Sequence, residues 1–171
     1  MTKPNDIATT RKPGVGFGPT ARFDRHRIES LDRDASMLLL RTAPVGRVGI
    51  SVDALPVIFP VNFVVARPHD DAPEVVVLRV GPGTKFEAAM HHNIVAFEAD
   101  GYDPMNHTGW SVLAQGRSQV LDERGALDWA RTLPLQPWAL SEALFFVTVA
   151  LDLVSGRRFG VHPRPPTSTP G

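Results

Sequence analysis

Alternation of apolar and polar residues is the strongest pattern in the chain, and it predicts a protein built mostly from β-strands. In the first such segment, residues 46–52, Val48, Ile50 and Val52 fall on one face. The next, from Leu55 to Val65, is apolar on both faces, so we expect both faces to be covered. Four further extended segments follow, at 74–80, 94–100, 108–121 and 144–154.

Short helical segments separate some of these strands. A helix is expected within 28–41, with Ser30 as N-cap and Pro44 beyond its end, and others at 84–92 and 122–131. The links between the first three strands are too short for helical crossovers, which favours an antiparallel meander. Strands and helices also fail to alternate as they do in a doubly wound α/β fold. The order therefore predicts a small, mostly antiparallel barrel.

Composition limits what such a barrel can do. The 171 residues hold 18 basic and 18 acidic side chains, so the concentrated positive charge typical of a dedicated nucleic-acid binder is missing. Without cysteine there is no disulfide scaffold, thiolate metal site or cysteine nucleophile. We expect no metal site. We also expect no membrane segment, because the longest apolar run is far shorter than the ~20 residues of a spanning helix. A signal-peptide core is also missing at the start, which makes the cytoplasm the expected location.

The chain holds 16 prolines and 14 glycines, and they are enriched at its two ends. Such segments bury too little apolar surface to offset the entropy lost on ordering. We therefore expect a flexible N-terminal tail at 1–27, one folded domain at 28–160 and a flexible C-terminal tail at 161–171.

The clearest candidate site lies where the strand at 74–80 runs into a Gly-Pro-Gly turn and a new helix. Thr84 and Glu87 have capping-box spacing, and a helix N-terminus favours an anion. Lys85 in the first helical turn and Arg79 at the strand end supply two cations that can face the same point. This arrangement predicts a phosphate site, or else a capped helix with two solvated cations.

Two other places offer polar or aromatic groups within apolar strands. Trp110 and Ser111 could give a planar ligand an aromatic wall and a hydrogen bond, although Trp110 could equally pack in the core. Asn62 is an amide within an apolar strand and needs a partner from the protein or from a ligand. His91 and His92 close the helix at 84–92, where a structural or solvent-exposed role is expected and haem or metal ligation by one of them is an alternative.

Five segments, taken in order, resemble the pyridoxamine 5′-phosphate oxidase-like family of flavin-binding split barrels. They are Gly46-Arg-Val-Gly-Ile, Leu55-Pro-Val-Ile-Phe-Pro-Val-Asn-Phe, Leu78-Arg-Val-Gly-Pro-Gly-Thr-Lys, Val95-Ala-Phe-Glu-Ala-Asp and Gly109-Trp-Ser-Val-Leu-Ala-Gln-Gly. The resemblance covers roughly residues 30–158 and implies a mainly β (α+β) fold, a six-stranded antiparallel split β-barrel with two or three short helices.

The resemblance also implies a homodimer that binds FMN in a groove between its subunits. It places the flavin ring beside Val61, Asn62 and Phe63. The phosphate would lie at Arg79, Thr84 and Lys85, with Val80 also among the cofactor-binding residues. Trp110 and Ser111 would approach the flavin, often from the partner chain.

The C-terminal segment lacks the Trp- and Arg-bearing pattern of true pyridoxamine 5′-phosphate oxidases, so that reaction is not expected. The sequence instead predicts an FMN-dependent oxidoreductase acting on a small molecule, with no catalytic residue or substrate identified. Two alternatives remain open: a reductase that uses the deazaflavin F420, and a non-catalytic module that binds flavin or haem.

Overall fold

The computed structural model describes residues 28–81, 90–135 and 145–160. These residues form eight strands and two helices. In this part of the chain no helix is both long and apolar enough to cross a membrane.

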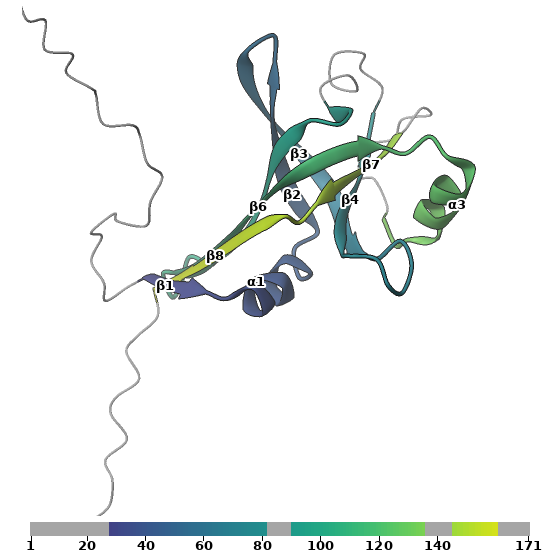
Figure 1. Cartoon of the computed structure of the whole chain (residues 1–171). Coiled ribbons are helices and arrows are strands. Elements are labelled where there is room, and N and C mark those ends of the chain that lie inside the picture. Colours follow the sequence, from purple (N-terminus) through teal and green to yellow (C-terminus); the bar gives the residue numbers. More distant parts are fainter. Residues whose placement is uncertain (1–27, 82–89, 136–144, 161–171) are drawn as a thin grey trace, which may run out of the picture.

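Six antiparallel strands close into a barrel, which confirms the predicted fold class (Figure 1). Around the barrel the order is β5-β2-β3-β4-β7-β6, and β6 pairs with β5 to complete the ring. The barrel strands are β2 (Val45–Val52), β3 (Leu55–Ala66), β4 (Val75–Val80), β5 (Ile94–Asp103), β6 (Thr108–Val120) and β7 (Phe145–Ala150).

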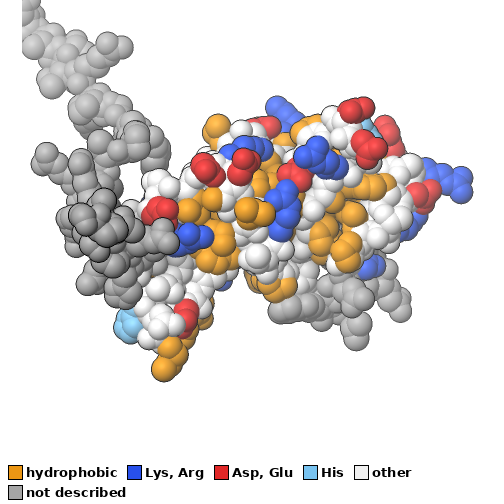
Figure 2. All heavy atoms as spheres, turned by 90° about the horizontal axis from the view of Figure 1, so that it is seen from below, with side chains coloured by type: hydrophobic (Ala, Val, Ile, Leu, Met, Phe, Trp, Pro, Cys, Tyr) orange, Lys and Arg blue, Asp and Glu red, His pale blue; other side chains and the backbone are white. Residues whose placement is uncertain are grey.

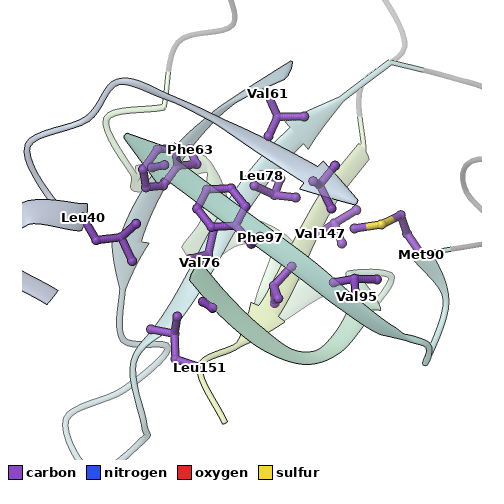
Figure 3. Packing of buried hydrophobic residues seen from close by; sticks show 14 of the residues in the cluster. Leu40, Val61, Phe63, Val76, Leu78, Met90, Val95, Phe97, Val147 and Leu151 are labelled. Atoms are coloured by element: carbon purple, nitrogen blue, oxygen red, sulfur yellow. The ribbon is translucent and has the colours of Figure 1, made fainter. Parts of the chain in front are cut away.

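Strand β3 changes partner halfway along its length. Residues 55–62 pair with β2, whereas residues 63–66 pair with β4. Its second half contributes Phe63 to the barrel interior, where the ring meets Phe97 edge-on with centroids 4.7 Å apart (Figure 3). Its first half runs out to the β2–β3 turn, which projects from the barrel at the top of Figure 1.

The expectation that both faces of 55–65 are covered is therefore wrong for the single chain. Leu55 and Ile58 are each 68% exposed, and Phe59 is 36% exposed. The β2–β3 arm extends beyond the barrel, and Leu55 and Ile58 on it remain largely exposed in the described part of the chain.

The extended segment expected at 144–154 is two strands, not one. β7 pairs with β4 and with the end of β6, and after a break at Leu151–Asp152 the chain continues as β8 (Leu153–Phe159) beside the start of β6. Gly116 of β6 lies against the carbonyl of Ala150 at this crossing, where a Cβ atom has no room.

Strand β8 also pairs with β1 (Ile28–Leu31), and this pairing corrects the predicted start of the first helix. Ser30 lies opposite Arg157 within the β1–β8 ladder and is not an N-cap. Helix α1 (Arg33–Leu40) begins instead after Asp32, whose Oδ1 accepts a hydrogen bond from the Ala35 amide at 2.8 Å.

Helix α3 (Arg124–Thr132) confirms the helix predicted at 122–131 and packs on the outer face of the barrel. A second apolar cluster joins Ala130 and Leu135 to Val77 and Phe146 on the outward faces of β4 and β7. The helix expected at 84–92 falls mostly outside the described residues; Met90 is helical, and His91 and His92 follow it.

Candidate functional site

Arg79 lies on the outer face of β4, beside helix α3. Its neighbours Leu78 and Val80 point into the barrel core, so the alternation of side chains turns Arg79 outward. The guanidinium carbon lies 5.5 Å from the centroid of the Phe146 ring on the adjacent strand. The Nε atom of Arg79 is buried and has no hydrogen-bond partner among the described residues.

A hollow of about 450 Å³ opens around Arg79, between α3 and the outer faces of β4 and β7. Its lining is apolar apart from two arginines: Arg79, Leu127, Ala130, Arg131, Leu133, Leu135 and Phe146. Arg131 comes from the last turn of α3 and holds Asp128 in an exposed ion pair at 2.9 Å. The hollow thus combines an apolar floor with guanidinium groups from two different elements.

Asn62 continues the same outer face on the neighbouring strand. The last paired residues of the β3–β4 ladder are Phe63 and Leu78, so Asn62 and Arg79 follow at the point where the two strands part. Asn62 is half-buried, and its Nδ2 donates to the carbonyl of Pro44 at 3.3 Å. The structure therefore brings together two of the expected site residues.

Other expected residues on these strands offer only their backbone to a ligand outside the barrel. The side chains of Val61, Phe63 and Val80 belong to the buried core. Figure 3 shows the first two of them. Thr84 and Lys85, the remaining members of the predicted phosphate site, lie outside the described residues.

Trp110 and Ser111 point to opposite faces of β6. Trp110 packs against the barrel core and lines a hollow of about 310 Å³ with Arg158 and Phe159. Ser111 faces outward and lines a smaller hollow of about 190 Å³ with Leu113, Ser155 and Arg157. Strands β5 and β2 separate β6 from β3, so Ser111 and Asn62 of one chain are about 14 Å apart across the sheet.

The outward face of this sheet carries an ion-pair cluster that was not predicted. Arg47 on β2 contacts Glu98 at 3.1 Å and Asp100 at 2.7 Å, both on β5. The hydrogen bond and charge of Asp100, followed by those of Glu98, raise the pKa of the Arg47 guanidinium above its usual range. On the face drawn in Figure 2, acidic and basic side chains likewise lie beside one another instead of forming one basic patch.

Exposed apolar side chains surround this cluster on the same sheet face. The strand register places Ile58 and Leu153 in one row and Leu113 beside Glu98 in the next. Ile58 and Leu153 are 68% and 67% exposed, and Ile94 on the same face is 65% exposed. Period-two alternation in β2, β5 and β6 was the sequence signal for this face, but only the register shows that these residues are neighbours.

His91 and His92 are both exposed, and their rings stack on each other with centroids 4.4 Å apart. Across the described ranges, no group of three or more acidic or histidine side chains could hold a metal ion.

Comparisons with known proteins support the fold and place the chain in a family. A family model described as pyridoxamine 5′-phosphate oxidase matches residues 32–158. An uncharacterised protein of Mycobacterium tuberculosis is 32% identical over 145 residues, which cover 81% of this chain and 90% of the relative.

Two solved structures at the same level of identity share the fold. The FAD binding protein from Mycobacterium smegmatis is 32% identical with a TM-score of 0.62, covering 78% of this chain and 97% of that one. A conserved protein of unknown function from Corynebacterium diphtheriae is also 32% identical, with a TM-score of 0.66 over 77% of this chain and 98% of its own.

Proposed function

The chain belongs to the pyridoxamine 5′-phosphate oxidase family, and we propose that it is a flavin-dependent oxidoreductase that binds the cofactor phosphate through Arg79. Flavin binding is named for a relative that is 32% identical, the FAD binding protein of Mycobacterium smegmatis. The observation that carries the proposal is the buried Nε of Arg79, which lacks a partner among the described residues.

A phosphate group fits this position on physical grounds. A buried N–H without an acceptor costs about 1–3 kcal/mol, and a phosphate oxygen provides an acceptor with the opposite charge. The ring of Phe146 covers one side of the guanidinium, and both residues line the hollow. Arg79 is thus already oriented before a ligand binds.

The flavin ring would lie toward Asn62, where β3 and β4 part. At this point the Asn62 amide and the backbone of Val61 and Phe63 supply the polar groups that a ring edge needs. A bound flavin supplies hydride- or electron-transfer chemistry, and the chain supplies binding and orientation. The sequence predicts FMN, whereas the named relative binds FAD. Both flavins carry a phosphate at the end of the ribityl chain that is attached to the flavin ring.

We also propose that the flavin site is completed by a second copy of the chain. Within one chain Ser111 lies about 14 Å from Asn62 across the sheet, and Trp110 points to the opposite face of β6. The exposed apolar side chains on the outward face of β3, β5, β6 and β8 are suited to pack against a second copy about a two-fold axis. Such a dimer would bring Ser111 of one subunit toward Asn62 of the other.

Reconstitution tests the proposal. The purified protein is mixed with FMN or FAD, passed through a desalting column and examined for absorption in the visible region. We expect a bound flavin in about one copy per chain. Addition of NADH or NADPH without oxygen should bleach that absorption if the flavin turns over, whereas binding without bleaching would support a non-catalytic flavin carrier.

A further inference from the structure

The hollow beside α3 is lined by a second cation, Arg131, besides Arg79. Arg79 alone can pair with a single phosphate through two parallel N–H groups. Arg131 enters the same hollow from the last turn of α3, which is a separate element. Guanidinium groups from two elements that line one hollow can each pair with a different phosphate of the same ligand.

Arg131 can contact a ligand without losing its present partner. Its ion pair with Asp128 uses one terminal nitrogen, and both side chains are 62% exposed. A guanidinium carries five N–H groups, so donors remain for a second anion. An exposed pair of this kind contributes little to stability, which makes its rearrangement on binding inexpensive.

The remaining lining suits a flat, weakly polar ring. Leu127, Leu133, Leu135 and Phe146 form the apolar part of the hollow and belong to, or pack against, the cluster beneath α3. Its volume of about 450 Å³ lies in the usual range for small-molecule sites. A ligand with two adjacent phosphates and an attached purine matches both halves of this lining.

We propose that Arg131 binds the second phosphate of a flavin dinucleotide, and that the hollow beneath α3 takes the adenylate half. This inference rests on the proposed function, since it assumes that Arg79 holds the phosphate next to the flavin. It makes Arg131 the residue by which the site prefers FAD to FMN.

The test compares the affinities of FAD and FMN for the full-length protein, measured by quenching of flavin fluorescence. Wild type should bind FAD more tightly than FMN. Arg131→Gln should weaken FAD binding about ten-fold, as expected for one partly exposed charge-assisted contact, and leave FMN binding within about two-fold. Arg131→Glu should weaken FAD binding further, because it adds repulsion.

Arg124→Gln is the matched control, since Arg124 lies in the first turn of the same helix and does not line the hollow. It should change neither affinity. Equal loss of FAD and FMN in Arg131→Gln, or no loss of FAD, would overturn this inference while leaving the flavin site intact. Failure of wild type to bind either flavin would overturn the proposed function as well.

Discussion

The guanidinium of Arg79 lies over the ring of Phe146, with 5.5 Å between its central carbon and the ring centroid. The two residues are direct partners in the β4–β7 ladder, so the barrel itself sets their alignment. A cation on an aromatic face keeps its charge while losing freedom of movement. The barrel thereby holds a positive group at the edge of an apolar hollow.

Removal of the Arg79 charge should weaken flavin binding. We expect Arg79→Ala to lower the affinity for FMN and for FAD by roughly 10- to 100-fold, because a charge-assisted contact of about 1.5–3 kcal/mol is lost. The measurement is a fluorescence titration with each flavin. Arg67→Ala is the control, since Arg67 directly follows the last residue of β3, does not line the hollow and has a side chain that is 55% exposed. Equal affinities in wild type and Arg79→Ala would show that the phosphate binds elsewhere.

A charge on the exposed sheet face should prevent dimer formation. Leu113→Asp places a carboxylate on β6 next to Glu98, within the face proposed to meet a second copy. We expect a monomer by light scattering, together with weakened flavin binding, because the site then lacks its second subunit. Leu38→Asp changes an equally apolar, 67% exposed side chain on α1 and should leave the assembly unchanged. A Leu113→Asp protein that stays dimeric would place the interface on another face.

The crossing of β6 and β7 should tolerate only glycine at position 116. An added Cβ at Gly116 meets backbone atoms of Ala150, which cannot move without disturbing the β6–β7 ladder. We expect Gly116→Ala to lower the free energy of unfolding by about 1–3 kcal/mol in a denaturant titration. Gly125→Ala is a matched control, because nothing lies within 4 Å of a Cβ added at this position and alanine favours a helix. A Gly116→Ala protein as stable as wild type would contradict the prediction that position 116 has no room for a Cβ atom.

Acid should loosen the β5–β6 turn through Asp103. Hydrogen bonds from the Asn106 side chain, then from the backbone amides of Asn106 and Met105, hold the pKa of this carboxyl below its ordinary value of 3.8. Since the folded pKa is depressed, the stabilisation is complete above the unfolded pKa of about 3.9 and disappears as pH falls through the folded pKa.

Two measurements check this behaviour. The Asp103 carboxyl resonance should titrate in NMR with a midpoint below 3.8. The difference in melting temperature between wild type and Asp103→Ala should be constant from neutral pH down to about pH 5 and shrink below pH 4. A carboxyl midpoint at or above its ordinary value would mean that the turn does not hold Asp103 in solution.

The local pattern of apolar and polar residues was sufficient to predict the barrel strands. It failed to predict element boundaries that depend on pairing between segments far apart in the sequence. Ser30 and Asp32 are both suitable N-caps, but the pairing of Ser30 with Arg157 extends β1 and leaves Asp32 to begin the helix. The apolar run at 144–154 gave no sign that it changes partner at Asp152, because the β7 and β8 partners lie on other strands.

The candidate site shows the same division. The sequence could single out Arg79, at a strand end before a Gly-Pro-Gly turn, and Asn62, an amide in an apolar strand, and cofactor binding by either residue stays a prediction. Arg131 could not be singled out, because its place at the hollow depends on how α3 packs on β4 and β7. The opposite directions of Trp110 and Ser111 follow from the two-residue period of a strand.

The visible absorption spectrum of the protein as purified, followed by mass analysis of the compound released on denaturation, tests flavin binding most directly. We predict the two absorption bands of an oxidised flavin and release of FAD, with a weaker signal from Arg79→Ala protein prepared in parallel. A haem Soret band or release of F420 would instead support one of the alternative cofactors. A colourless protein that also takes up neither FMN nor FAD when they are added would contradict the proposed function.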